Sequence, residues 1–258
     1  MTAERKASAP PSISIITATY NSEKTIRDAL ESVASQNYPN VEHIIQDGAS
    51  TDETLKVIEA FGLDRPKLAS EADGGIYDAL NRGIARASGE VIGLLHSDDT
   101  FASPEVLNWV AEVFSRNPAL DAVYGDLEYV SANDPNRIIR YWKSGDFNLR
   151  KLRNGWMPPH PTLFLRRRVF EQYGDYNTGM RIAADYDAIL RWLNVHRIKI
   201  HYLRQTLVKM RLGGASNRSI SAIIKKSTED LQAIRRNKAG GVLTLVLKNL
   251  RKLGQFKF

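Results

Sequence analysis

Three short polar segments follow apolar, strand-like stretches of the sequence, and their side chains could bind a charged ligand. The segments are residues 17–21 (TATYN), 47–52 (DGASTD) and 96–99 (HSDD). In an open parallel sheet, ligands bind in the crevice beyond the carboxyl ends of the strands. The sequence therefore predicts that these segments, which are far apart in the chain, converge on one site.

Asp98 and Asp99 are adjacent carboxylates at the end of an apolar stretch. Such carboxylates raise each other's pKa unless a cation or hydrogen-bond donors stabilise the charged form. Mg²⁺ and Mn²⁺ prefer oxygen ligands and typically bridge one or two carboxylates to a substrate's phosphates. The pair suits a divalent metal beside a nucleoside diphosphate, although a helix cap or a solvated turn is the commoner use of such residues.

Two further acids stand beside glycines. Asp47 precedes Gly48 and could accept a hydrogen bond from a base or a ribose, while a turn stabilised by its own side chain is the simpler interpretation. Asp73 precedes two glycines, which would let the backbone approach a ligand or would merely form a turn. Four other polar residues fit helix caps better than ligand contacts: Asn21, Ser22, Ser50 and Asp52.

The second half of the chain offers fewer candidates. Asp185 and Asp187 precede an apolar helical pattern, and either could cap that helix. Asp185 lies among small residues and could instead act as a general base toward a hydroxyl. His160, between prolines, fits a structural hydrogen bond better than a ligand contact, and residues 213–216 (GGAS) form either a surface turn or a phosphate-binding loop.

Elements of an α/β fold must position these residues. Strand-like stretches at residues 12–17, 41–46 and 90–95 alternate with helical patterns, of which one covers residues 76–87. This alternation predicts a mainly parallel, Rossmann-like sheet with right-handed crossovers and flanking helices. The regular alternation of strands and helices ends after residue 124. We therefore expect the first half of the chain to bind the donor molecule and the second half to be the acceptor side.

Composition limits the remaining possibilities. The 258 residues are 43% hydrophobic and 25% charged, which suits one principal globular core. The chain has no cysteine, which excludes disulfides, thiolate zinc sites and cysteine nucleophiles. Residues 1–11 carry no apolar stretch typical of a secretion signal and are expected to be a disordered lead-in. No run of 18 apolar residues predicts a membrane span.

The net charge of +7 is unevenly distributed. Basic residues gather in residues 150–168 and in the tail, residues 219–258, which reads as a basic amphipathic helical extension. Residues 241–258 suit either an anionic membrane surface or a helix packed on the domain. Nucleic acid is not expected as a partner, because acids rather than interleaved aromatic and basic residues line the predicted site.

Taken in order, the motifs resemble the family 2 glycosyltransferases, which have the nucleotide-diphospho-sugar-binding GT-A fold. The resemblance rests on SIITATYN (14–21), IIQDGASTDET (44–54) and EADGGIYDALNRGIARASGEVIGLLHSDD (71–99). HPTLFLRRRVFEQYG (160–174) and RIAADYDAILRW (181–192) are similar to the branch that builds bacterial cell-surface polysaccharides. The resemblance implies a GT-A domain over residues 12–218, with a donor-binding half at 12–125 and an acceptor-side half at 126–218.

The resemblance also implies roles for individual residues. Asp98 and Asp99 would contact the metal, Mg²⁺ or Mn²⁺, and Asp98 also the ribose, while Asp185 would be the catalytic base. Asp47 would bind uracil or an equivalent base. The other implied donor contacts are Thr17, Thr19 and Asn21 around the nucleotide, and Asp73 and Arg82 in the donor pocket.

Three departures from the family pattern refine the expectation. His96 stands where the fullest metal motif has an acid, and Gly48 replaces the second of two acids. The chain around Trp192 lacks the Gln-x-x-Arg-Trp pattern of processive synthases, so transfer of a single sugar is expected.

The resemblance then implies an inverting transferase that uses a nucleotide-sugar, with UDP-sugar favoured. Its acceptor would be a hydroxyl of a glycan or of a lipid-linked acceptor in cell-surface polysaccharide synthesis. We expect a cytoplasmic protein, on or near the inner face of the cell membrane. The alternative from another class is a non-catalytic nucleotide-sugar-binding protein with the same fold.

Overall fold

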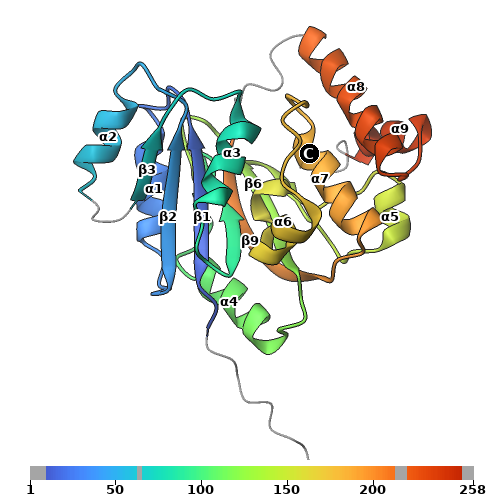
Figure 1. The fold of residues 1–258 in the computed structure, drawn as a ribbon, viewed down its shortest axis with the longest axis horizontal. Coiled ribbons are helices and arrows are strands. Elements are labelled where there is room, and N and C mark those ends of the chain that lie inside the picture. The colour runs from blue at the N-terminus through green and yellow to red at the C-terminus, as the bar shows by residue number, and fades with distance from the viewer. Residues whose placement is uncertain (1–9, 63–65, 213–219, 252–258) are drawn as a thin grey trace, which may run out of the picture.

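The computed structural model describes residues 10–62, 66–212 and 220–251. Its first half alternates strands and helices: β1 (Ile13–Thr19), α1 (Ile26–Ala34), β2 (Val41–Asp47), α2 (Thr54–Ala60), β3 (Pro66–Ser70), α3 (Ile76–Ala85) and β4 (Val91–Leu94). These four strands are parallel, in the order β3-β2-β1-β4. The predicted α/β fold with a parallel sheet is thereby confirmed for this half (Figure 1).

The second half adds strands of both directions. It comprises β5 (Thr100–Phe101), α4 (Val106–Arg116), β6 (Ala122–Val130), β7 (Ile138–Trp142), α5 (Leu149–Arg153), β8 (Phe164–Arg166), α6 (Arg167–Tyr173), α7 (Ala184–Leu190) and β9 (Ile200–Arg211). β8 pairs antiparallel with both β4 and β6, and β9 runs parallel to β6. The sheet order is β3-β2-β1-β4-β8-β6-β9-β5, and β7 pairs with β6.

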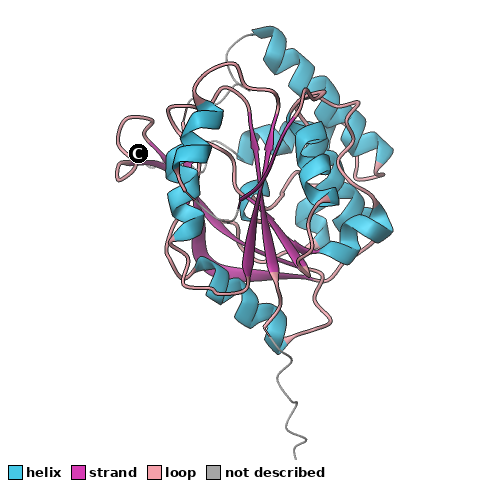
Figure 2. Cartoon of the chain, turned by 60° about the vertical axis from the view of Figure 1, so that its left-hand side comes forward, coloured by secondary structure: helices cyan, strands magenta, loops and turns pink. Residues whose placement is uncertain are grey.

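Alternation along β1 explains why helices cover both sides of the sheet, as Figure 2 shows. Ile13 and Ile15 point into one core, with α1 and α4, while Ile16 and Ala18 point into the other, with α3 and α7. Successive side chains of a strand face opposite sides, so an all-buried strand needs cover on both faces. β1 is buried throughout, and its polar residues Ser14, Thr17 and Thr19 are buried together with its apolar ones.

Close packing of α3 on β1 fixes where α3 begins. A Cβ atom at Gly83 would lie 2.4 Å from Cγ2 of Ile16, so only glycine permits this approach. α3 packs against β1 and β2, and its first turn lies at the carboxyl ends of these strands (Figure 1).

The predicted C-terminal helical extension is present as α8 (Ile220–Arg236) and α9 (Val242–Arg251). We call these two helices the C-terminal hairpin. Ala233 and Ile234 of α8 and Ala239 belong to the same core as Trp192. The hairpin is thus packed on the domain, next to α7 and α5 (Figure 1). Among the described helices, none is long and apolar enough to cross a membrane.

Two predicted helix caps are wrong. Neither Asn21 nor Ser22 caps α1, which begins at Ile26 without a side-chain cap. Asn21 has a φ of 49° and its Oδ1 accepts a hydrogen bond from the Thr51 backbone at 2.9 Å. It thus joins two loops instead. The prediction for Asp52 holds in part, since its Oδ1 accepts from the Thr54 backbone N–H, at the first residue of α2, at 3.0 Å.

His43 on β2 gives a testable acid sensitivity. Burial lowers the pKa of His43 from its usual 6.5 to about 4. Between pH 6.5 and pH 4 the unfolded chain binds a proton at His43 that the folded chain does not. The contribution of neutral His43 to the free energy of unfolding is therefore complete above pH 6.5 and is lost as the pH falls toward 4. The loss from this one group should be about 2 kcal/mol at pH 5.

We expect His43→Gln to reduce the loss of unfolding free energy between pH 7 and pH 5 by about 2 kcal/mol. Glutamine can still reach the Thr17 hydroxyl, whose Oγ1 lies 2.9 Å from His43 Nε2. Urea unfolding at both pH values measures the difference. His201→Gln, which changes an exposed imidazole on β9, is the matched control. An unchanged pH dependence in His43→Gln would show that this histidine is not the cause.

Candidate active site

The carboxyl ends of β1, β2 and β3 lie level, which gathers the first polar residues. Thr19 is opposite Asp47 across the β1–β2 pair, and Asp47 is opposite Ser70 across the β2–β3 pair. The backbone N–H of Gly48 donates to the Thr19 carbonyl at 2.9 Å. The register of the sheet thus brings together residues that are more than fifty positions apart in the sequence.

Asp47 is fully buried and holds the turn after β2. Its Oδ2 accepts from the Ser50 backbone at 2.9 Å and from the Ser70 hydroxyl at 2.7 Å, and its Oδ1 accepts from the Ser50 hydroxyl. Asp47 therefore stabilises the turn with its own side chain, which is the simpler of the two interpretations given from the sequence. A carboxylate has about four lone-pair sites, so one further donor, such as a base N–H, could still be accepted.

Gly48 leaves the space that Asp73 occupies. A Cβ atom at Gly48 would lie 2.7 Å from Oδ2 of Asp73 and 3.5 Å from the Tyr20 ring. Asp73 is half-buried, and its Oδ1 accepts from the Gly75 backbone at 2.8 Å. The family pattern has an acid at position 48. In this chain Gly48 stands there, and the carboxylate of Asp73 lies next to the turn instead.

The other predicted donor contacts lie around this turn with different accessibility. Thr17 is fully buried, and its hydroxyl lies against His43, so it does not face a ligand in this structure. Asn21 is exposed and tied to the second loop. Thr19 is buried, and its hydroxyl has no hydrogen-bond partner within the described part of the chain. Such an unsatisfied buried hydroxyl is uncommon and suits a polar ligand.

Arg82 of α3 supports the loop that carries Asp73. Its guanidinium pairs with Asp78 at 2.9 Å and with Glu71 at 3.2 Å, and it donates to the Ala72 carbonyl at 3.1 Å. The side chain is one-third exposed. Arg82 therefore has a cationic surface beside the predicted donor pocket, while its described contacts are to the loop.

The structure separates the two adjacent acids, Asp98 and Asp99. Asp98 is half-buried and accepts no hydrogen bond from the described residues. Asp99 is only 1% exposed; its Oδ1 accepts from the Arg211 backbone at 3.2 Å, and its Oδ2 has no partner among the described residues. Burial, and then the charge of Asp98, raises the pKa of Asp99 well above its usual range. Burial therefore favours the neutral form of Asp99, and Asp98 is the accessible carboxylate.

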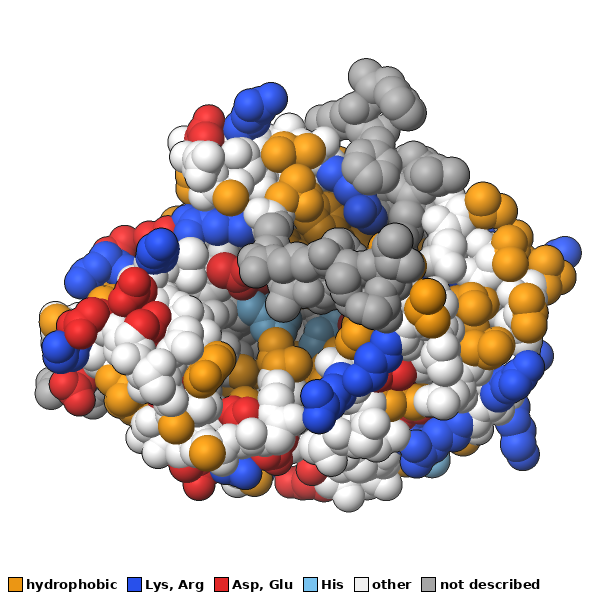
Figure 3. Space-filling model, turned by 90° about the horizontal axis from the view of Figure 1, so that it is seen from above, with side chains coloured by type: hydrophobic (Ala, Val, Ile, Leu, Met, Phe, Trp, Pro, Cys, Tyr) orange, Lys and Arg blue, Asp and Glu red, His pale blue; other side chains and the backbone are white. Residues whose placement is uncertain are grey.

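His96 lies between Asp98 and the second half of the site. Burial lowers the pKa of His96, while the carboxylates of Asp98 and Asp185 act on it in the opposite direction. Both acids are thus within electrostatic reach of one imidazole. Seen from the carboxyl ends of the strands, histidine side chains lie in a central hollow with acidic side chains nearby (Figure 3).

Asp185 is the second residue of α7 and is half-buried. Its Oδ1 accepts from the Tyr77 hydroxyl at 3.2 Å and from the Tyr186 backbone at 2.8 Å. Tyr77 stands in the first turn of α3, directly after the loop of Asp73. The hydrogen bond from Tyr77 therefore connects the acid of the second half to the end of the sheet where the first-half residues lie.

Aromatic residues fill the space between these acids. His160 is buried, its Nε2 lies 2.9 Å from the Tyr176 hydroxyl, and its ring centroid is 6.3 Å from that of His96. Burial lowers the pKa of His160 to about 4, so it is neutral at pH 7. The structural hydrogen bond favoured from the sequence is present. Residues 213–216, the other predicted phosphate-binding candidate, lie outside the described residues.

A divalent metal would have few protein ligands here. In the described ranges, no three His, Asp or Glu side chains form a cluster that could hold a metal by themselves. Mg²⁺ commonly uses one or two carboxylates and completes its shell with substrate phosphates and water. The half-buried carboxylate of Asp98 fits such a metal, whereas Asp99 is buried and its raised pKa favours the neutral form, which is a poorer ligand.

Sequence reasoning did not identify Tyr77 and Glu229. Tyr77 lies in the motif of residues 71–99, from which the sequence indicated only Asp73, Arg82, Asp98 and Asp99 as donor or metal contacts. Glu229 is a buried acid on α8, at helical spacing from Ala233 and Asn237, which are also buried. An acid on the buried stripe of an amphipathic helix is the signal that could have indicated it.

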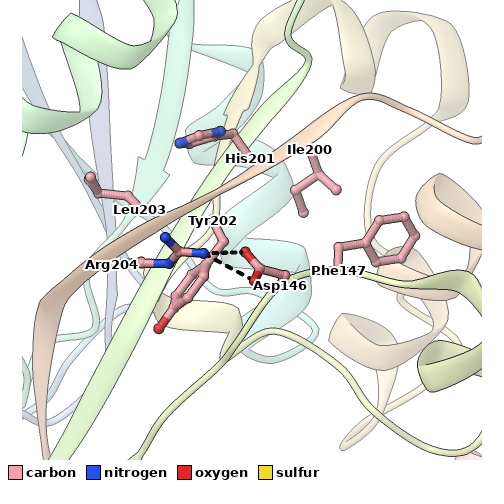
Figure 4. Close-up of a pocket in the computed structure, with 7 residues that line it drawn as sticks. All are labelled: Asp146, Phe147, Ile200, His201, Tyr202, Leu203 and Arg204. Carbon is pink, nitrogen blue, oxygen red and sulfur yellow. Dashed lines mark hydrogen bonds and ion pairs between the residues drawn. The ribbon is translucent and has the colours of Figure 1, made fainter.

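A separate hollow lies at the beginning of β9 (Figure 4). Residues 200–204 of β9 line it together with Asp146 and Phe147, and Arg204 pairs with Asp146 at 3.2 Å. This ion pair is exposed, and none of the predicted site residues contributes to the walls. The carboxyl ends of the strands, and not this hollow, therefore form the candidate site.

Comparisons with known proteins agree with this geometry. The sequence model of "Glycosyl transferase family 2" matches residues 14–174. A PGL/p-HBAD biosynthesis glycosyltransferase of Mycobacterium bovis (strain BCG / Pasteur 1173P2) is 32% identical over 213 residues, which are 81% of this chain and 80% of the relative. An uncharacterized glycosyltransferase of Mycobacterium tuberculosis (strain ATCC 25618 / H37Rv) is 32% identical over 190 residues, 70% of this chain and 68% of the relative.

Solved structures share the fold. S. aureus TarS 1-349 in complex with UDP-GlcNAc superposes with a TM-score of 0.66 and 20% identity, covering 88% of this chain and 65% of that chain. The mannosyltransferase PcManGT from Pyrobaculum calidifontis, in complex with GDP-Man and Mn²⁺, gives a TM-score of 0.63 and 18% identity, covering 95% and 70%. The matched sequence spans more than half of the chain, and the relatives are glycosyltransferases, so this chain belongs to glycosyl transferase family 2.

Proposed function

We propose that the chain transfers a single sugar from a UDP-sugar to a hydroxyl of a glycan or lipid-linked acceptor in cell-surface polysaccharide synthesis. One observation carries the proposal: Asp98 and Asp185, from opposite halves of the chain, both lie within electrostatic reach of the half-buried imidazole of His96. A leaving diphosphate and an attacking hydroxyl need one group each, on either side of the transferred sugar.

The reaction we infer is a one-step displacement that inverts the sugar carbon. The acceptor oxygen forms a bond to the anomeric carbon, and the bond from that carbon to the phosphate oxygen breaks, with its electron pair leaving on the nucleoside diphosphate. The hydroxyl proton moves to the carboxylate of Asp185. Tyr77 shares its one hydroxyl proton between the Ile182 carbonyl at 2.9 Å and Oδ1 of that carboxylate at 3.2 Å, which orients the carboxylate and leaves Oδ2 for the acceptor proton.

The donor half supplies binding rather than proton transfer. Asp47 and Asp73 contact the turn at Gly48, where we propose the nucleoside lies. We propose that Asp98 would hold Mg²⁺ or Mn²⁺, with Asp99 beside it. The bound metal would neutralise charge on the departing diphosphate. Positioning and charge neutralisation together account for most of the expected rate enhancement of such a transfer.

A panel of nucleotide-sugars tests the reaction class. Purified protein is incubated with UDP-, GDP- and dTDP-sugars, with and without Mn²⁺, and release of the nucleoside diphosphate is measured. We expect release from at least one UDP-sugar, dependent on the metal. TarS was solved with UDP-GlcNAc and PcManGT with GDP-Man, so both nucleotides belong in the panel. Binding without release from every donor would favour a non-catalytic nucleotide-sugar-binding protein.

We further propose that α9 contacts an anionic membrane surface. The side of α9 that faces the domain carries Leu245, which packs against the core, and two buried polar residues: Thr244 donates to the Arg153 carbonyl, and Lys248 is buried against Asp230. Four other apolar side chains face outward, where Val242, Leu243, Val246 and Leu250 are 57%, 71%, 46% and 55% exposed. Much of the apolar surface of α9 is therefore not packed on the domain.

The charges of the C-terminal hairpin support an anionic partner. Both of its acids, Glu229 and Asp230, are buried. The charged side chains that are exposed in the described part of the hairpin are all basic: Lys225, Arg235, Arg236, Lys238 and Arg251. Figure 3 shows apolar and basic side chains together at the right-hand edge, where α8 and α9 lie in Figure 1. Apolar side chains beside cations are typical of a helix at an anionic interface.

Vesicle binding tests this surface. We expect Leu243→Ser with Val246→Ser to weaken binding to phosphatidylcholine–phosphatidylglycerol vesicles by about tenfold or more, because both side chains lose apolar area. Binding to phosphatidylcholine alone should be weak for all proteins. Ile138→Ser with Ile139→Ser, two exposed apolar residues on β7, is the matched control. Equal binding by both double variants and the wild type would exclude α9 as the contact.

A further inference from the structure

The C-terminal hairpin holds the loop that leads into α7. The carboxylate of Glu229 accepts three successive backbone N–H groups, from Arg181 at 3.2 Å, Ile182 at 2.7 Å and Ala183 at 3.0 Å. Successive N–H groups form a concave site for an anion, and here the anion is a side chain of the same protein. Glu229 is buried, and its bond with Ala183 is buried as well, while those with Arg181 and Ile182 are partly buried.

The same loop is held from the opposite side by Tyr77. The Tyr77 hydroxyl lies 2.9 Å from the Ile182 carbonyl and 3.2 Å from Oδ1 of Asp185. The peptide groups of Ile182 are therefore bound on one side by α8 and on the other by α3. Asp185 follows three residues later, and its backbone position depends on this double contact.

Two further contacts of the hairpin reach α7 just beyond Asp185. Lys248 lies 3.6 Å from the centre of the Tyr186 ring and pairs with Asp230 at 2.5 Å. The side-chain amide of Asn237 donates to Oδ1 of Asp187 at 2.8 Å. The hairpin thus contacts the chain before and after Asp185 without occupying the Asp185 carboxylate itself.

Glu229 also removes a competing use of Asp185. The N–H groups of residues 181–183, which directly precede α7, would otherwise be available to a nearby aspartate. Leaving them without an acceptor would destabilise the loop, because an unpaired donor away from water is costly. Because Glu229 satisfies them, Asp185 can direct its carboxylate toward Tyr77 and the site.

We propose that Glu229 is a positioning residue for Asp185, an inference that rests on the proposed transferase function. It does not contact the substrate. Removing it should allow the loop of residues 181–183 to move and Asp185 to turn toward the freed N–H groups. A displacement of about 1 Å at a reacting group can lower the rate about 100-fold.

The test compares chemistry with nucleotide binding. For Glu229→Ala we expect kcat for sugar transfer to fall by about 10- to 100-fold, with the Kd for UDP unchanged within about twofold. Glu229→Gln keeps one carbonyl oxygen as an acceptor, so its kcat should lie between those of Glu229→Ala and the wild type. If Glu229→Ala does not fold, the same comparison on Glu229→Gln decides.

Thr244→Val is the matched control. It removes another buried hydrogen bond of the hairpin, from Thr244 to the Arg153 carbonyl at 2.9 Å, on α9 and away from the loop. We expect a lower melting temperature with kcat within about twofold of the wild type, because only general docking is weakened. Wild-type kcat in Glu229→Ala, or an equal loss of kcat and UDP affinity, would overturn the proposal.

Hydrogen exchange separates this inference from the proposed function. We expect faster exchange of the amides of residues 181–183 in Glu229→Ala than in Thr244→Val, irrespective of any activity. If the wild type transfers no sugar from any donor, the proposed function fails, but faster exchange still supports the positional role. Equal exchange in the two variants overturns the role whether or not the wild type is active.

Discussion

Asp185→Asn is expected to lower the rate of sugar transfer by about 10²- to 10⁴-fold while leaving the affinity for UDP within about twofold of the wild type. The change keeps the shape of the side chain and the acceptor for the Tyr77 hydroxyl, but it removes the group that takes the acceptor proton. Steady-state transfer assays and calorimetric titration with UDP measure the two quantities. A non-catalytic binding protein would transfer no sugar with or without the change, and its affinity for UDP would stay the same.

Asp187→Asn is the matched control for this prediction, because it alters a second carboxylate on the same helix. Asp187 is buried, pairs with Arg191 at 3.2 Å and accepts from Asn237. Its loss should lower the melting temperature, with transfer remaining within about tenfold of the wild type. If Asp185→Asn keeps wild-type transfer, another group must remove the proton.

Asp98→Asn is expected to reduce kcat/KM for donor cleavage by about 10²- to 10³-fold and to raise the Mn²⁺ concentration that gives half-maximal rate. Asp98 is the accessible member of the pair. The effect should be larger than that of Asp99→Asn, because Asp99 is buried and its raised pKa favours the neutral form, which asparagine resembles in shape and charge.

Mn²⁺ titrations of donor cleavage for both variants measure this difference. We expect Asp99→Asn to remain within about tenfold of the wild type, and unfolding curves identify any loss of stability. Equal inactivation by the two changes, in folded proteins, would indicate that Asp99 also binds the metal. In that event the nucleotide-sugar must draw Asp99 out of the buried position described here.

The sequence predicts the first half of the fold well because its signals are local. β1 is buried on both faces and is rich in isoleucine, and polar turns at Asp47 and Asp98 mark the ends of parallel strands. Parallel strands joined by helices must place these ends at one edge. The grouping of Asp47 near Asp73 follows from this rule, although their contact through Gly48 does not.

The short strands depend on pairing partners that are distant in sequence. β3 has only five residues and begins with Pro66, and β8 has three residues, so neither carries a clear period. Their existence is decided by pairing with β2, β4 and β6. Local patterns therefore indicate little about the half that carries the proposed acceptor site.

Side-chain direction is the second kind of information that the sequence lacks. Asp98 and Asp99 are neighbours, yet one is accessible and the other is buried under the end of β9. The hydrophobic pattern of α9 indicates an amphipathic helix, but it does not reveal that Thr244 and Lys248 would form the packed side. Both outcomes follow from tertiary partners, in these cases Arg211, Arg153 and Asp230.

A crystal structure of the protein with UDP and Mn²⁺ tests the central claim most directly. We predict that the uracil lies at Asp47, that the diphosphate and the metal lie at Asp98, and that the Asp185 carboxylate faces the free end of the diphosphate across the space for one sugar. UDP bound elsewhere, or bound at Asp47 with Asp185 turned away from the diphosphate, would contradict the account.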